Sequence, residues 1–160
     1  MTHKLKQLNI YLKYQTKVYQ YFWYRLDYKK EDADDLCAEV FCRMVENFDS
    51  YDQSRSALAW LLGIAHNIWC NYLRVEGREI PLENIADIGI DNREIAHQKI
   101  ESEKILAKLD KFSLYDRNVI LLKYIEGLRC KEIAEILGKK EGTIRTHIHR
   151  VIKKLKLLYN

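Results

Sequence analysis

Residues 131–150 read KEIAEILGKKEGTIRTHIHR, the pattern of two short helices joined by a sharp turn. Gly138 separates the two helical patterns, and a tight turn at this place needs a residue that tolerates a positive φ. Ala134 is small, as required where two helices cross closely. We therefore predict a helix-turn-helix. The apolar residues of its second helix share one face at helical spacing; they are Ile144, Ile148, Val151, Ile152 and Leu155.

The opposite face of this second helix is basic. Residues 139–156 carry seven basic side chains and one acidic side chain, a net charge of +6. A helix of this charge fits the major groove of DNA, where its first turns reach base edges. We expect Arg145 to bind guanine with two hydrogen bonds, and Thr146 and His149 to read neighbouring bases. Phosphate contacts, which position a helix without reading sequence, are expected from Thr143, Arg150, Lys153 and Lys154.

The charge of the chain is uneven along its 160 residues, although the formal net charge is only +4. Residues 1–78 have a net charge of +1, residues 79–98 of −4 and residues 99–160 of +7. The acidic stretch also holds the single proline, Pro81, and lacks helical spacing. We predict two small domains, at 1–78 and 99–160, joined by a flexible acidic linker at 79–98.

Helical periodicity and the scarcity of glycine and proline favour an all-α protein. Asp32 is the expected N-cap of one helix, with Asp35 as its capping-box partner. Ser113 and Asp116 suggest the same arrangement at the start of another. The expected helices lie at about 4–26, 33–48, 56–75, 100–109, 113–126, 130–137 and 142–158.

The sequence indicates neither a membrane span nor a metal or cofactor site. It has no run of about 18 uncharged apolar residues and begins without the apolar core of a secretion signal, so we expect a cytoplasmic protein without membrane insertion. His147 and His149 point about 200° apart on a helix and cannot share an ion. His66 and Cys70 share a helix face but lack a second pair of ligands. The cysteines form no C-x-x-C pair and are expected to be reduced and partly buried: Cys37, Cys42, Cys70 and Cys130.

Three segments resemble motifs of bacterial RNA polymerase sigma factors of the sigma-70 family, in the family's order. Residues 32–41 (DADDLCAEVF) resemble region 2.2, and residues 59–74 (AWLLGIAHNIWCNYLR) resemble regions 2.3 and 2.4. Residues 109–127 (LDKFSLYDRNVILLKYIEG) resemble the start of region 4, which the helix-turn-helix completes. The motifs cover nearly the whole chain without counterparts of regions 1 and 3, as is typical of the extracytoplasmic-function (ECF) group.

The resemblance implies a subunit that binds core RNA polymerase, recognises the minus-35 and minus-10 elements of promoter DNA and starts transcription of a specialised regulon. It implies no enzyme activity, no cofactor and no nucleotide hydrolysis, because binding energy and base capture open the strands. Members of the family are commonly held inactive by an anti-sigma factor. Such a partner is therefore expected for this chain.

By this resemblance, the minus-10 element is held by one face of the helix at 56–75 and by the loop before it. Rings that stack, amides that read base edges and basic groups that hold phosphate suit single-stranded DNA. A flipped base is expected in the loop. The expected contacts are Trp60, Asn67, Asn71 and Arg74 on the helix and Tyr51, Asp52, Ser54 and Arg55 in the loop. Trp60 fits a core position equally well.

The resemblance also places polymerase docking on the helix that follows Asp32. Asp35 and Glu39 match acidic positions of the docking motif. Glutamine usually stands where this chain has Ala38, which removes one polar contact. In the family the acidic linker lies against a basic channel and imitates nascent RNA, although a solvated tether explains its charges as well: Glu83, Asp87, Asp91 and Glu94.

Two other classes of protein remain as alternatives. An autonomous helix-turn-helix regulator would explain the basic C-terminal helix and would bind duplex DNA without polymerase. It would not explain the surface formed by Trp60, Asn67 and Asn71. A two-metal nuclease could be imagined from the acidic residues around Asp35. One helix start cannot surround a metal, however, and capping with the helix dipole accounts for acidic residues there.

Overall fold

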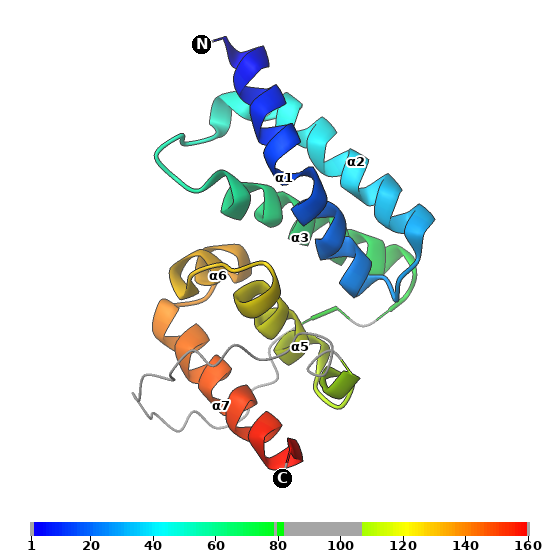
Figure 1. Ribbon diagram of the computed structural model, residues 1–160, viewed down its shortest axis with the longest axis vertical. Helices are drawn as coiled ribbons and strands as arrows, with labels where there is room; N and C mark the ends of the chain where they lie inside the picture. The colour runs from blue at the N-terminus through cyan, green and yellow to red at the C-terminus, as the bar shows by residue number, and fades with distance from the viewer. Residues whose placement is uncertain (1, 79, 82–106, 160) are drawn as a thin grey trace. The chain divides into compact units, whose positions relative to one another are not determined.

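The computed structural model of the chain describes residues 2–78, 80–81 and 107–159 (Figure 1). Within these ranges the chain forms helices and no β-strand, which confirms the predicted all-α class. It divides into two compact units, Met1–Arg78 and Glu79–Asn160. Most of the expected linker and of the helix expected at 100–109 lies outside the described residues. No helix in the described ranges is both long and apolar enough to cross a membrane.

Three helices build the first unit, and each packs on the other two (Figure 1). They are α1 (His3–Arg25), α2 (Lys30–Glu46) and α3 (Ala57–Val75), with a short 3₁₀ turn at Phe48–Ser50. Their apolar stripes face a common core, because no single helix can bury its own stripe. The buried side chains include Phe22, Val40, Met44, Leu62, Ala65 and Trp69.

The sequence explains where α3 begins and ends. Ser56 Oγ accepts a hydrogen bond from the Ala59 amide at 3.2 Å, which satisfies one free N–H of the first turn. Beyond the last turn, Gly77 adopts a φ of +66°, which glycine enters without steric cost. The helix expected at 56–75 is therefore confirmed.

The start of α2 differs from our prediction, because Asp32 is not its N-cap. The helix begins at Lys30, and the cap residue Lys29 makes no side-chain bond. Asp27 and Tyr28 both have positive φ, and their turn leads the chain into the helix before Asp32 is reached. The Asp32 carboxylate instead accepts a hydrogen bond from Tyr72 Oη at 2.9 Å, which ties α2 to α3.

A histidine is held neutral inside the first unit. His66 Nε2 lies 3.6 Å from Cys70 Sγ, and its Nδ1 is buried without a hydrogen-bond partner. Burial, aided by the nearby Arg25 guanidinium, lowers the pKa of His66 to about 4. The Arg25 guanidinium carbon itself lies 3.6 Å from the centre of the Tyr21 ring. Protonating His66 would therefore place a second cation beside a buried one.

We expect the first unit to lose stability in acid through His66. The imidazole has its ordinary pKa in the unfolded chain, so the unfolded state takes up a proton first as the pH falls from about 6.5 to about 4. The unfolding free energy should drop by up to about 3 kcal/mol over this window relative to a His66→Gln variant. Urea denaturation of both proteins at several pH values checks this. Parallel stability curves for the two proteins would contradict it.

The second unit contains the predicted helix-turn-helix. Its described helices are α5 (Leu114–Ile120), a π-helical continuation (Leu121–Ile125), α6 (Cys130–Leu137) and α7 (Glu141–Tyr159). Ser113 Oγ caps α5 by accepting from the Asp116 amide at 3.2 Å. The Asp116 side chain, however, does not complete the expected capping box; it bonds to α7.

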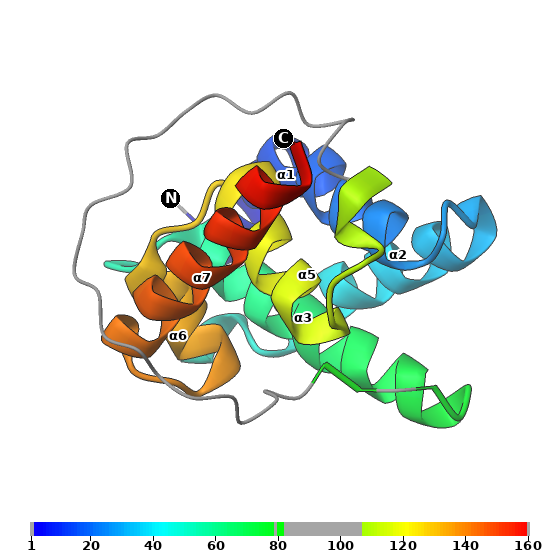
Figure 2. The same cartoon turned by 90° about the horizontal axis from the view of Figure 1, so that it is seen from below.

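The turn between α6 and α7 has the geometry that its sequence predicts (Figure 2). Gly138 has a φ of +66°, and its amide donates to the Ala134 carbonyl. Ala134 is buried, with 5% of its surface exposed. The five apolar residues expected to face the core from α7, namely Ile144, Ile148, Val151, Ile152 and Leu155, are between 0% and 5% exposed. The helix-turn-helix is thereby confirmed.

Candidate nucleic-acid interfaces

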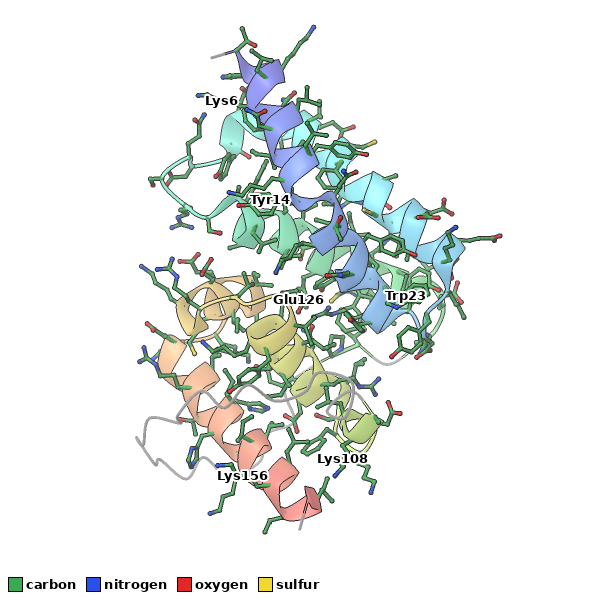
Figure 3. All side chains as sticks on the ribbon, in the orientation of Figure 1. Lys6, Tyr14, Trp23, Lys108, Glu126 and Lys156 are labelled. Atoms are coloured by element: carbon green, nitrogen blue, oxygen red, sulfur yellow. The ribbon has the colours of Figure 1, made fainter. Side chains whose placement is uncertain are left out.

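The outward face of α7 carries a row of residues at spacings of four, seven and eleven: Gly142, Thr146, His149 and Lys153. Lys153 is exposed, whereas Thr146 and His149 are half-buried. Lys156 extends this face toward the end of the helix (Figure 3). The row is continuous along one side of the helix because α7 is regular over its whole length.

Arg145 flanks this row and is ion-paired within its own helix. Its Nη2 lies 2.5 Å from Glu141 Oε1, and the two side chains are 66% and 41% exposed. Such exposed pairs stabilise a helix by only about 0.3–0.5 kcal/mol. The pair therefore orients the guanidinium, yet costs little to exchange for a base edge.

Thr146 and His149 offer less hydrogen-bonding capacity than their side chains suggest. Thr146 Oγ1 donates to the Gly142 carbonyl at 3.0 Å, so its methyl group and lone pairs face outward. A methyl group suits contact with thymine. His149 Nδ1 is buried and makes no hydrogen bond, which leaves Nε2 as the ring atom that can read a base. Thr143 is half-buried at the opposite edge of the face.

Arg150, expected to contact phosphate, is half-buried and engaged inside the unit. Its Nη2 lies 3.1 Å from His147 Nδ1, and His147 Nε2 bonds to the Asp116 carboxylate of α5. Our sequence reasoning considered His147 only as a metal ligand and missed this cluster. Its place between Ile144 and Val151, at the edge of the apolar stripe, was the available signal.

The loop between α2 and α3 begins with an aromatic stack. The rings of Tyr51 and Trp60 lie 4.4 Å apart at 15°, and Phe48 meets Trp60 edge-on at 6.2 Å. Trp60 is half-buried, so it belongs neither to the core alone nor to the surface alone. Tyr51 Oη also donates to the Arg55 carbonyl at 2.8 Å, which bridges the loop.

Asp52 shapes this loop from within. Its Oδ1 accepts hydrogen bonds from the Ser54 amide at 3.0 Å and the Ser54 hydroxyl at 2.6 Å, the arrangement of an Asx turn. These bonds, with the Arg55 guanidinium 3.7 Å away, hold the pKa of Asp52 below its usual value. The exposed Arg55 is in turn directed by Asp52.

The N-terminal turns of α1 also contact the loop, which sequence reasoning did not foresee. Lys6 Nζ donates to Gln53 Oε1 at 2.8 Å (Figure 3). His3 Nδ1 lies 3.3 Å from an Asp49 carboxylate oxygen. These contacts join residues about 47 positions apart, and no local pattern announces them.

The remaining helix residues expected at the minus-10 element are all exposed on α3. Asn67, Asn71 and Arg74 follow one another at spacings of four and three, which places them in one row. Tyr72 faces the other way, toward Asp32. The row and the structured loop adjoin opposite ends of the same helix, so an extended strand can contact both.

The acidic residues expected to contact polymerase differ in their surroundings. Asp35 is exposed, whereas Glu39 accepts from Arg43 Nη2 at 2.6 Å. Ala38 lines a groove of about 860 Å³ between α1 and α2, beside Tyr11, Phe41 and Val45. The groove is mainly apolar, which suits a protein partner more than a charged one.

The four cysteines are free thiols, but their burial differs from our expectation for one of them. Cys42 is exposed, because it lies on the solvent side of α2. Burial, with the nearby Asp34, raises the pKa of Cys37 to about 11. Among the described residues no three His, Cys, Asp or Glu side chains are grouped closely enough to hold a metal ion.

Comparison with known proteins matches both units. Residues 10–79 match the family model of sigma-70 region 2, and residues 102–155 match that of sigma-70 region 4. The ECF RNA polymerase sigma factor SigW of Bacillus subtilis is 32% identical over 154 residues, which cover 86% of this chain and 80% of SigW. SigX of the same organism is 26% identical, over 92% of this chain and 80% of SigX.

Solved structures of similar fold span both units. The sigma factor RpoE, solved with the anti-sigma factor NepR from Bartonella quintana, has a TM-score of 0.70 and 22% identity, covering 99% of this chain and 98% of its own. CnrH, solved in complex with the cytosolic domain of CnrY, has a TM-score of 0.69 and 20% identity, covering 98% and 89%. At this identity the likeness concerns the fold.

Proposed function

Since the chain belongs to the ECF group of sigma-70 family RNA polymerase sigma factors, we propose a specific division of labour between its two units. It is a transcription initiation factor with a region 2 and a region 4. We assign polymerase docking and the minus-10 element to residues 1–78, and the minus-35 element to residues 99–160. Residues 79–98 form the linker in this scheme, and the site of action is the cytoplasm.

The observation that carries the minus-10 assignment is the structured loop beside a row of exposed amides. The Asp52 turn and the Tyr51–Trp60 stack form the loop before DNA arrives. A preformed loop loses little conformational entropy when it captures a flipped base. Asn67 and Asn71 then offer amides to neighbouring bases, and Arg74 offers charge to phosphate.

In the second unit, the exposed face of α7 enters the major groove at the minus-35 element. Arg145 contacts guanine, and Thr146 with His149 reads adjacent bases. Lys153 and Thr143 hold phosphates. The protein contributes binding energy alone, so strand opening needs neither a cofactor nor nucleotide hydrolysis.

Two protein partners follow from this assignment. Core polymerase docks on α2 at Asp35 and Glu39, and the apolar groove beside Ala38 supplies contact area in place of the usual glutamine. RpoE and CnrH were each solved with a bound partner, NepR being an anti-sigma factor. We extend this to the present chain and propose that an anti-sigma factor binds it.

The requirement for core polymerase tests this function against that of an autonomous regulator. Duplex promoter fragments are titrated with the full chain, with core polymerase, and with both together. We expect specific binding only when both are present. Specific binding by the chain alone, unchanged by core polymerase, would favour the autonomous regulator.

We expect Asp52→Ala to weaken binding of the minus-10 strand several-fold, because the loop loses its internal turn. Asp52→Asn keeps an oxygen that accepts from Ser54 and should retain most of the affinity. Binding of the polymerase complex to a single-stranded minus-10 oligonucleotide measures both variants. Equal losses in the two would show that Asp52 contacts DNA directly and does not act through the turn.

A further inference from the structure

A buried polar cluster joins α5 to α7 in the second unit. His147 is 5% exposed and Asp116 is 9% exposed. Their side chains are hydrogen-bonded, and the Tyr115 ring meets the imidazole edge-on at 4.8 Å. On the other side of His147, Arg150 Nη2 lies 3.1 Å from Nδ1. Arg150 is the member of the cluster nearest the proposed DNA face, since it is only half-buried.

The chemistry of the partners determines the proton on His147. A guanidinium has five donors and no acceptor, so Nδ1 must accept from Arg150. The Asp116 carboxylate is an acceptor, so Nε2 must carry the hydrogen that it receives. His147 is therefore a neutral imidazole protonated on Nε2, and each of its nitrogens has a partner.

We propose that His147 is a positioning residue of the minus-35 helix, whose neutral form retains Arg150 against the domain and whose protonated form releases it to DNA phosphate. This inference rests on the function proposed above. A proton on Nδ1 would face a donor that it cannot bond and a like charge 3.1 Å away. The Asp116 carboxylate stabilises the imidazolium in place, so Arg150 is the group that moves.

The surroundings permit this exchange. Asp116 and Tyr115 face the cluster from α5, and Arg150 and Lys154 from α7. Burial alone would raise the pKa of Asp116, but the bond from His147 and the charges of Arg150 and Lys154 lower it, so the carboxylate stays ionised. Asp116 and Arg150 also line a cavity of about 530 Å³ that Lys111 and Ser113 share. This cavity gives the cluster a route to solvent.

The release of Arg150 adds one phosphate contact, which salt dependence detects. Binding of the polymerase complex to promoter DNA is measured at several salt concentrations, at pH 5.5 and pH 8. For the wild type, the slope of log K against log salt should be steeper by about 1 at pH 5.5. His147→Gln donates to Asp116 and accepts from Arg150 without titrating, and it should show no change of slope. Arg150→Ala should show none either.

Two results would overturn the role of His147 while the complex still binds promoter DNA. One is a wild-type slope that is the same at both pH values. The other is a change of slope that persists in His147→Gln. Nitrogen NMR of the free chain is an independent check, because at pH 8 it should show His147 protonated on Nε2; protonation on Nδ1 contradicts the inference. Failure of the wild-type complex to bind any promoter DNA would instead overturn the proposed function.

Discussion

The Ile144→Ala variant should lose about 3 kcal/mol of unfolding free energy in the second unit and, with it, minus-35 binding. Ile144 is fully buried where α7 leaves the turn, and truncation of such a side chain leaves a cavity that costs about 2–5 kcal/mol. A small unit has only about 5–10 kcal/mol in total. Urea denaturation of the full chain, followed by circular dichroism, measures the loss.

The same helix provides a matched control for this substitution. Leu157 is 70% exposed, so Leu157→Ala should change the unfolding free energy by less than about 0.5 kcal/mol. If the two variants were equally stable, Ile144 would not be a core residue and the orientation of α7 would be wrong.

The Arg145→Ala variant should weaken minus-35 binding by about 1–3 kcal/mol and lose preference at one base pair. The physical reason is the loss of a two-pronged donor that only guanine matches in the major groove. Selection of promoter fragments by the polymerase complex measures both the affinity and the preferred bases. An unchanged base preference would remove the assignment of Arg145.

Two further variants separate base reading from charge. Lys156→Ala removes a cation at the end of the same face and should weaken all sequences alike. Glu141→Gln removes the ion pair of Arg145 and should keep the base preference, because that pair only orients the guanidinium. A loss of preference in Glu141→Gln would show that Glu141 determines how Arg145 meets the base.

Features that depend on neighbouring residues could be predicted from the sequence. The turn at Gly138 and the buried stripe through Ile144 follow from backbone conformation and helical spacing. The cap at Ser56 is equally local. Asp32 shows the limit of such reasoning, because two residues with positive φ upstream placed the helix start earlier.

Contacts between distant residues could not be predicted in this way. Asp116 and His147 are 31 positions apart, and neither residue alone distinguishes a buried pair from a solvated one. The ambiguity of Trp60 also needed the fold, because its ring partner Tyr51 lies in a loop without periodicity. The exposure of Cys42 depends on which side of α2 the other helices cover.

Run-off transcription with core polymerase, the full chain and a library of genomic DNA tests the central claim most directly. We predict new transcripts that start downstream of a shared pair of sequence elements, and their loss when Arg145 and Asn71 are both replaced by alanine. Core polymerase that starts no new transcripts with this chain, over a range of promoters and salt concentrations, would contradict the account.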